Sequence, residues 1–247
     1  MHQTAFEPPY VSLSRCDQTL DECGYAVVHP DEVRDWLPAS REELAQLHRA
    51  WDDLPADTYL KDGGRYRRRR HSSFVLDGAR VTPVLHRAHW QPLEYNALHG
   101  GMRRWFEPME AGTLAQPVWT RLLQRLGETA STLHGQRPWF VEAHPFRIDT
   151  TDGIGRPTPE GAHRDGVDLV AVFMVGRHAI KGGESRVFAA DGPAGQRFTL
   201  LHPWSLLLLD DARVIHETTP IQPQVPGEMG WRDTLVLTYR RDGFQGG

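Results

Sequence analysis

The second half of the chain, from about residue 139, consists of short apolar segments separated by turns, and this pattern restricts the fold more than any other feature. Clusters of Gly, Pro and Asp such as Asp191–Gly195 separate the segments, and no helical pattern lies between them. The pattern predicts an antiparallel sandwich or barrel, in its simplest form a jelly roll. The predicted strands are Phe140–Ile148, Asp168–Val175, Ser185–Ala189, Arg197–Leu201, Ser205–Leu209 and Thr234–Tyr239.

The first half of the chain carries the clearer helical signals. The segment Ser40–Glu43 has the form of a capping box and predicts the start of a helix. The apolar stripe of this helix consists of Leu44, Leu47 and Trp51. A second helix is predicted from Pro117, since proline is favoured in the first helical turn. We therefore expect one domain over residues 1–247, mainly β with flanking α, in which a helical and mixed part (1–138) packs on one face of a jelly-roll core (mostly 139–247).

Composition argues against several classes of protein. The chain is 39% hydrophobic and 24% charged, which is typical of soluble globular proteins. Its net charge of −4 predicts no general attraction to nucleic acid or to an anionic membrane, even though Arg65–Arg70 is basic. The two cysteines, Cys16 and Cys23, have no Cys/His cluster around them, and the N-terminus lacks the pattern of a secretory signal. We expect a cytoplasmic protein with a small-molecule substrate; homo-oligomerisation stays open.

A metal site is indicated by the pair His163 and Asp165. Non-haem Fe(II) oxygenases bind iron through two histidines and one carboxylate and leave three coordination positions open. A His-x-Asp pair suits such a site, because alternate residues of an extended segment project to the same side. The pair alone carries little weight: with 13 histidines and 18 aspartates in 247 residues, about one is expected by chance, and two occur.

The sequence context separates the two pairs. In His29-Pro30-Asp31 the proline cannot donate a hydrogen bond to a central sheet, and Asp31 leads into a helix-like segment, so we interpret Asp31 as a helix N-cap. His163-Arg164-Asp165 follows a turn-rich segment, Gly155–Gly161, and precedes the most apolar predicted strand. We therefore expect its side chains at the mouth of a sheet.

His216 and Arg232 complete the predicted site. His216 follows the apolar run Leu206–Leu209 and a turn, so it can supply the second histidine from another strand. Arg232 opens the last predicted strand, whose alternate residues Arg232, Thr234, Val236 and Thr238 face one side. A buried arginine is costly unless it binds an anion, and a guanidinium can bind a carboxylate through two hydrogen bonds. Taken alone, Arg232 is explained better by a surface salt bridge, but beside three candidate ligands it predicts a site for a dicarboxylate.

The motifs around these residues resemble the bacterial 2-oxoglutarate–Fe dioxygenases that include L-isoleucine 4-hydroxylase. The resemblance is strongest from Glu142 to Tyr239 and covers most of the chain after about residue 55. The matching motifs are Pro157–Asp168, Gly182–Ser185, Asp210–Ile221, the strand that opens at Arg232, and, more loosely, Arg65–Arg68 and Gln91–Gly101.

The resemblance implies a double-stranded β-helix that binds Fe(II), 2-oxoglutarate and O2, with ascorbate as reductant in vitro, and that hydroxylates a free L-amino acid. It implies His163, Asp165 and His216 as iron ligands, with no other catalytic residue. It also implies Arg232 as the anchor of 2-oxoglutarate, assisted by Thr218 or Thr234. An amino acid needs further partners for its carboxylate and ammonium groups. We expect these among Glu160, Arg147, Asn96 and Arg67.

Other functions stay open at this point. An oxygenase of the same fold could act on a carrier-bound or peptide substrate, or could desaturate or cyclise its substrate. A cupin-like metal protein that is not an oxygenase could use the same three ligands, but it would not need Arg232. A serine hydrolase is disfavoured, because the sequence contains no Gly-x-Ser-x-Gly motif.

Overall fold

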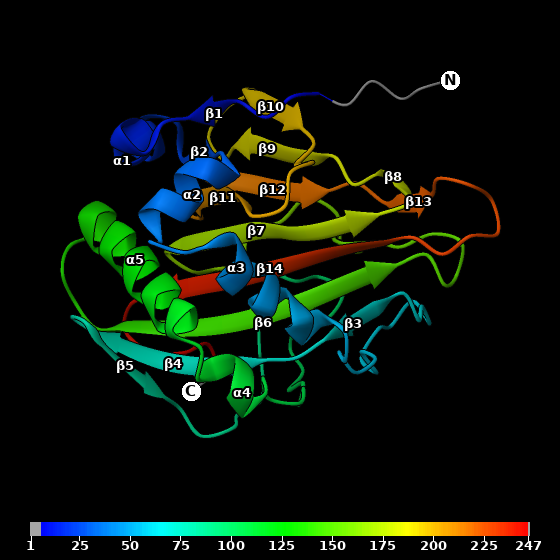
Figure 1. The fold of residues 1–247 in the computed structure, drawn as a ribbon, viewed down its shortest axis with the longest axis horizontal. Coiled ribbons are helices and arrows are strands. Elements are labelled where there is room, and N and C mark those ends of the chain that lie inside the picture. Colours follow the sequence, from blue (N-terminus) through cyan, green and yellow to red (C-terminus); the bar gives the residue numbers. More distant parts are fainter. Residues whose placement is uncertain (1–5, 247) are drawn as a thin grey trace.

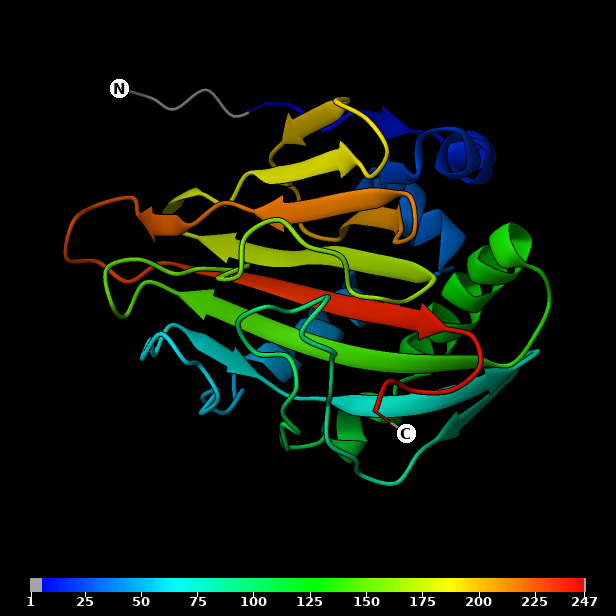
Figure 2. The same ribbon diagram turned by 180° about the vertical axis from the view of Figure 1, so that it is seen from behind.

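A nine-stranded sheet runs through the protein and separates a layer of helices from a smaller group of strands (Figures 1 and 2). The computed structural model describes residues 6–246. Residues 1–5 and Gly247 lie outside the described residues. The N-terminal segment for which no secretory signal is predicted begins in residues 1–5. In spatial order the strands of the large sheet are β1 (Tyr10–Val11), β2 (Tyr25–Val28), β11 (Ser205–Asp210), β7 (Leu169–His178), β14 (Trp231–Arg240), β6 (Trp139–Asp149), β4 (Ser72–Asp77) and β5 (Arg80–Pro83), with β3 (Arg67–Arg69) paired to the end of β6.

The remaining strands form two small sheets beside the large one. They are β10 (Gly195–Phe198), β9 (Ser185–Ala189) and β12 (Val214–Thr218) in one sheet, and β13 (Ile221–Pro223) and β8 (Ile180–Gly182) in the other. All pairings among these strands and among the long strands of the large sheet are antiparallel, whereas β1 and β2 are parallel. The prediction of a mainly β, jelly-roll fold with flanking helices is confirmed.

The helices lie on one face of the large sheet, as predicted (Figure 1). They are α1 (Leu13–Cys23), α2 (Pro30–Trp36), α3 (Arg41–His48) with the 3₁₀ turn η1 (Arg49–Trp51), α4 (Ala111–Leu114) and α5 (Pro117–His134). The capping box is confirmed: the Ser40 hydroxyl accepts from the Glu43 N–H at 3.1 Å, and the Glu43 carboxylate accepts from the Ser40 N–H at 2.8 Å. None of the helices within residues 6–246 is long and apolar enough to cross a membrane.

The N-cap of α2 is His29, so the assignment of Asp31 as the cap was wrong. Pro30 occupies the first helical position, which suits proline because its fixed φ is helical and the N–H that it lacks would have no helical partner there. The cap must then be the residue before it, and the His29 Nδ1 atom accepts a hydrogen bond from the Asp31 N–H at 3.3 Å. The pair His29 and Asp31 therefore marks the start of a helix.

Alternate residues of the central strands enter two different hydrophobic cores. In β7, Leu169, Ala171 and Phe173 pack with the helices, whereas Val170 and Met174 pack with residues of the small sheet. This explains why β7 is almost continuously apolar: both of its faces are covered.

The predicted strand Arg197–Leu201 was only partly right. The strand β10 begins two residues earlier, at Gly195, and ends at Phe198, because it pairs with β9 across a short turn. Leu200 is fully buried beyond the end of this ladder. Its apolar character therefore reflects core packing and not strand pairing.

Candidate metal centre and its cavity

The side chains of His163, Asp165 and His216 converge at one point. His163 and Asp165 lie in the loop between β6 and β7, and His216 lies in β12. The Asp165 carboxylate oxygens are 3.8 Å from Nε2 of His163 and 3.3 Å from Nε2 of His216. One nitrogen or oxygen atom from each residue lies within 4.8 Å of the others, so the three could hold one metal ion.

Backbone contacts fix the two histidines relative to each other. His163 and His216 form an isolated antiparallel bridge, with N–H to C=O distances of 3.0 Å and 2.9 Å. The Nδ1 atom of His163 lies 3.0 Å from the Gly161 carbonyl oxygen. When Nδ1 donates to this carbonyl, Nε2 keeps its lone pair, as a metal ligand requires.

The loop that carries Asp165 is held by Asp211, a fully buried carboxylate that directly follows β11. Its Oδ1 atom accepts a hydrogen bond from the Asp165 N–H at 2.9 Å, and its Oδ2 atom accepts from Gly166 at 2.7 Å and from Val167 at 3.1 Å. Burial and the nearby Asp165 raise the pKa of Asp211. Asp211 therefore positions the ligand loop through three backbone contacts.

The charges around His163, Asp165 and His216 favour the ionised form of the Asp165 carboxylate. Burial by itself would raise the pKa of the Asp165 carboxyl, but the hydrogen bond with His216 and the nearby His163 hold it well below its usual range. Burial likewise acts to lower the pKa of His163, yet Asp165 and Glu160 raise it overall. One carboxylate and two imidazoles on one side of a metal form the donor set of non-haem Fe(II) sites.

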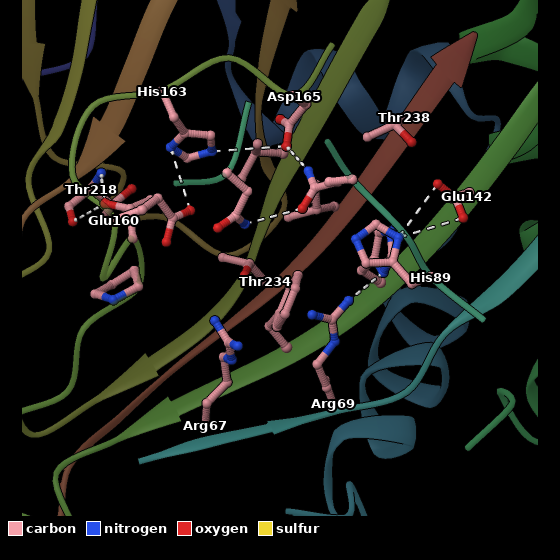
Figure 3. A pocket seen from close by; sticks show the side chains of 18 of the residues that line it. Arg67, Arg69, His89, Glu142, Glu160, His163, Asp165, Thr218, Thr234 and Thr238 are labelled. Carbon is pink, nitrogen blue, oxygen red and sulfur yellow. Dashed lines mark hydrogen bonds and ion pairs between the residues drawn. The ribbon is translucent and has the colours of Figure 1, made fainter. Parts of the chain in front are cut away.

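The three side chains face a cavity whose floor is the large sheet (Figure 3). Alternate residues of three neighbouring strands line it, namely Arg232, Thr234, Val236 and Thr238 of β14, Glu142, His144, Phe146 and Ile148 of β6, and Arg67 and Arg69 of β3. The predicted common face of Arg232, Thr234, Val236 and Thr238 is therefore confirmed. Figure 3 shows His163 and Asp165 on one side of the cavity and Arg67 and Arg69 on the other.

Arg232 lies in this cavity as a buried cation. The residue is 3% exposed, and within residues 6–246 its guanidinium forms no ion pair and its Nε atom has no hydrogen-bond partner. Burial lowers the pKa of Arg232 to about 9, and the neighbouring Arg177 contributes to this. Such a guanidinium is suited to bind an anion.

Five of the other predicted residues also line the cavity: Thr218, Thr234, Glu160, Asn96 and Arg67. Two of them already have protein partners. The Nε atom of Arg67 donates to Asp57 at 2.7 Å, and the Asn96 side chain donates to Gln91 at 3.1 Å. Glu160 differs, because its buried Oε2 atom has no hydrogen-bond partner among the described residues.

Arg147 does not line the cavity. It lies on β6 between Phe146 and Ile148, so strand alternation turns it to the opposite face of the sheet. There its guanidinium donates two hydrogen bonds to Asp233, both 2.7 Å long. The prediction that Arg147 contacts a substrate in this cavity was therefore wrong.

A second group of metal-binding residue types lies buried at the far end of the cavity floor: His71, His89, Glu142 and His144. The rings of His71 and His144 are stacked, with 14° between their planes and 4.8 Å between their centroids. A metal lies close to the plane of each imidazole that binds it, and two stacked, nearly parallel rings do not share such a position. Cations also hydrogen bond to the cluster, since Arg69 contacts His144 at 2.6 Å and Arg87 contacts Glu142 at 3.1 Å. The cluster is therefore better described as a hydrogen-bonded network around Glu142.

Comparison with known proteins gives one family and several related structures. The chain matches the family model described as 2OG-Fe dioxygenase over residues 48–238. No curated protein sequence gives a significant match. A bsmA homologue from Methylobium petroleophilum is 49% identical, with 97% of each chain covered and a TM-score of 0.91. Two further structures share the fold: IDO from Bacillus thuringiensis (16% identity, 92% of this chain and 98% of that chain, TM-score 0.76) and the Fe(II)/α-ketoglutarate-dependent dioxygenase TqaL (19%, 94% and 88%, TM-score 0.73).

Proposed function

We propose that this chain, which belongs to the 2OG-Fe dioxygenase family, hydroxylates an unactivated C–H bond of a free L-amino acid. Fe(II), 2-oxoglutarate and O2 are the cofactor and cosubstrates of the family. The observation that carries the proposal is that two charged groups line the same cavity as the triad of His163, Asp165 and His216. They are Arg232, a buried cation without an ion pair among the described residues, and Glu160, a largely buried carboxylate whose Oε2 atom has no hydrogen-bond partner there. The cation suits a carboxylate of 2-oxoglutarate, and the anion suits the ammonium group of an amino acid.

His163, Asp165 and His216 are the residues that would hold the iron. Their donor set fits Fe(II), and Asp211 and the backbone bridge between the two histidines hold the set in place. When bound, iron would supply the oxidising chemistry with O2 as the oxidant: one oxygen atom of O2 enters succinate as 2-oxoglutarate loses CO2, and the other enters the hydroxylated product. The chain itself binds, orients and shields the reactants from water.

Arg232 would bind the carboxylate of 2-oxoglutarate that is remote from the metal. Its guanidinium offers a planar pair of donors for a carboxylate, and a buried ion pair of this kind removes the cost of the isolated cation. Thr234 lies two residues along the same strand, and Thr218 follows His216 by two residues on β12, and both line the cavity. They are suited to donate further hydrogen bonds to the carboxylate.

Glu160 would bind the substrate ammonium group. Its side chain is 10% exposed, its Oε1 atom lies 3.6 Å from Nδ1 of His163, and its Oε2 atom is free to accept a hydrogen bond from a ligand. An ammonium group donates three hydrogen bonds and neutralises a buried carboxylate. Contact with Glu160 would place the substrate beside the residues that hold the iron.

The test measures succinate formed by the purified protein with Fe(II), ascorbate and 2-oxoglutarate while each proteinogenic L-amino acid is added in turn. At least one amino acid should stimulate succinate release and yield a hydroxylated product by mass spectrometry. His216→Ala should abolish the stimulation, because the metal loses one of three protein ligands. Failure of every amino acid to stimulate turnover in the iron-loaded wild type would overturn the proposal.

A matched pair of variants tests the role of Glu160. Glu160→Gln should raise the KM for the amino acid about 10-fold or more, since a charge-assisted contact is lost, and should leave the KM for 2-oxoglutarate unchanged. Glu217→Gln is the control: Glu217 is adjacent to His216 but pairs with Arg186 outside the cavity. Equal effects of the two substitutions would exclude a specific contact between Glu160 and the substrate.

A further inference from the structure

Arg69 is another buried guanidinium in the cavity, and among the described residues no carboxylate is hydrogen bonded to it. It lies on β3 and is 3% exposed. Its guanidinium carbon lies 3.8 Å from the ring centroid of Phe106 and 4.3 Å from that of Phe146. One Nη atom contacts Nδ1 of His144 at 2.6 Å, and the Nε atom has no hydrogen-bond partner among residues 6–246. The aromatic faces and the imidazole reduce the cost of burying this cation, but none of them carries a negative charge.

Arg104 is a further buried guanidinium that lines the cavity, and its guanidinium carbon lies 5.9 Å from the centroid of the same Phe106 ring that Arg69 contacts. It is 2% exposed, donates to the neutral side chain of Gln91 at 3.0 Å, and forms no ion pair within the described part of the chain. Burial lowers the pKa of Arg104 to about 10. Burial also lowers the pKa of Arg69 well below its usual value, and Arg67 and Arg104 contribute although Asp57 and Glu142 oppose them. Two neighbouring buried cations that share no anion are a strong indication of an anion site.

The guanidinium of Arg69 and the side chain of Arg232 lie against different residues: Arg69 contacts His144 on β6, whereas the Cδ atom of Arg232 lies beside Gly183, 3.6 Å from the position of a Cβ added there. In the sheet, Arg69 pairs with Phe146 on β6, whereas Arg232 pairs with Ile148 on the other side of β6. The Cα atoms of Arg69 and Arg232 are separated by two strand spacings across the sheet and by two residues along the strands, which corresponds to roughly 12 Å. The cavity therefore contains two separate cationic regions, one around Arg232 and one around Arg69 and Arg104.

We infer that Arg69 and Arg104 form a second anion site that binds the carboxylate of the substrate. The inference rests on the proposed function, since it supposes that an amino acid occupies the cavity, and it names the residues that recognise the acid group. Figure 3 shows Arg69 across the cavity from Glu160. Because the ammonium and carboxylate groups of an amino acid share one carbon, contacts with Glu160 and with Arg69 and Arg104 would fix the orientation of that carbon, and so determine which side-chain carbon is presented to the metal. His144 acts as a positioning residue, because its Nδ1 atom must stay unprotonated to accept from Arg69.

The experiment compares the amino acid that best stimulates succinate release with its own carboxamide, which has the same shape but no carboxylate charge. The wild type should show a KM for the amide about 10- to 100-fold above that for the acid, as expected for loss of a charge-assisted hydrogen bond. Arg69→Met and Arg104→Met should each raise the KM for the acid by a similar factor. Neither should change the KM for the amide by much, so the ratio of the two KM values falls toward about one.

Arg68→Met is the matched control, because Arg68 is the strand neighbour of Arg69 but is exposed and points away from the cavity. It should leave both KM values unchanged. Thermal unfolding and the KM for 2-oxoglutarate report whether a variant keeps its fold and its cosubstrate site. If a variant does not fold, the acid-to-amide ratio of the wild type still decides: a wild type that does not distinguish acid from amide overturns the inference. An equal rise of the KM values for the acid and for the amide in folded Arg69→Met would also overturn the inference. Neither result affects the proposed function, which fails only if no amino acid is turned over.

Discussion

Replacing His89 by glutamine should make the stability of the protein less sensitive to acid. His89 lies in the network around Glu142, with its ring 4.7 Å from that of His144 and 5.4 Å from that of His71. Burial lowers the pKa of His89 to about 4; Glu142 opposes this, and Arg104 and His71 contribute to it. The side chain is therefore neutral in the folded protein at any pH near neutrality.

The pKa values set the size and the sign of the effect. A histidine in the unfolded chain has a pKa of about 6.5. Between that pH and about 4, the unfolded state binds a proton at His89 that the folded state does not bind. The free energy of unfolding is therefore unaffected above about pH 6.5 and falls as the pH is lowered through this interval. The loss for His89 alone amounts to about 3 kcal/mol, with a steepest slope of about 1.4 kcal/mol per pH unit.

Urea unfolding of the wild type and of His89→Gln, followed from about pH 7 to about pH 4.5, measures this contribution. Glutamine can still donate a hydrogen bond to Glu142 but does not titrate. The two proteins share all other titratable groups, so any constant offset reflects packing, and the pH-dependent part of the difference reports on His89. The wild type should lose about 2 to 3 kcal/mol more than the variant over this range. Parallel curves for the two proteins would refute the reasoning.

Three further predictions concern the cosubstrate site, the ligand loop and a helix end. Arg232→Met should raise the KM for 2-oxoglutarate about 10- to 100-fold and Arg232→Lys less, whereas an unchanged KM would move the anchor elsewhere. Asp211→Asn should weaken Fe(II) binding on the order of 10-fold, measured by titration of Fe(II) into the apoprotein, because an amide cannot accept all three backbone hydrogen bonds. An unaltered affinity would show that these hydrogen bonds are not needed to position the ligand loop. Ser40→Ala should lower the free energy of unfolding by about 1 kcal/mol without affecting turnover. Ser12→Ala, at an N-cap whose side chain makes no capping hydrogen bond, should have almost no effect, and equal losses at the two caps would contradict the assignment.

The sequence predicts the elements whose signals are local. The capping box at Ser40, the proline that opens α5 and the apolar runs of β7 and β11 each depend on a few neighbouring residues, and the structure confirms them. Strands β3, β4 and β5 were not predicted. They are short and partly charged, and they are ordered through pairing with β6 or with each other. Their formation depends on contacts between residues far apart in the sequence, which periodicity does not report.

The same distinction applies to the site. The site of His163, Asp165 and His216 could be predicted because each of these residues lies beside an apolar, strand-like run and because the motifs around them resemble a family of iron dioxygenases. Arg69 was not singled out, because its burial depends on the pairing of β3 with β6, about 75 residues along the chain. Arg147 could have been excluded from sequence: it has the same parity as Val141 and Ala143, whose apolar side chains face the helical layer.

The register of β14 has a consequence for how this protein can vary. Its even-numbered residues from Arg232 to Thr238 face the cavity, while Asp233 is buried on the opposite face beside Arg147 and His48. A slip of one residue would exchange the two faces and bring Asp233, an anion, to the wall where Arg232 now stands. Length changes in the preceding connection, residues 224–230, are therefore compatible with binding a dicarboxylate only when the connection absorbs them completely. Homologues in which that connection differs in length should still have an arginine two residues before the residue that corresponds to Thr234.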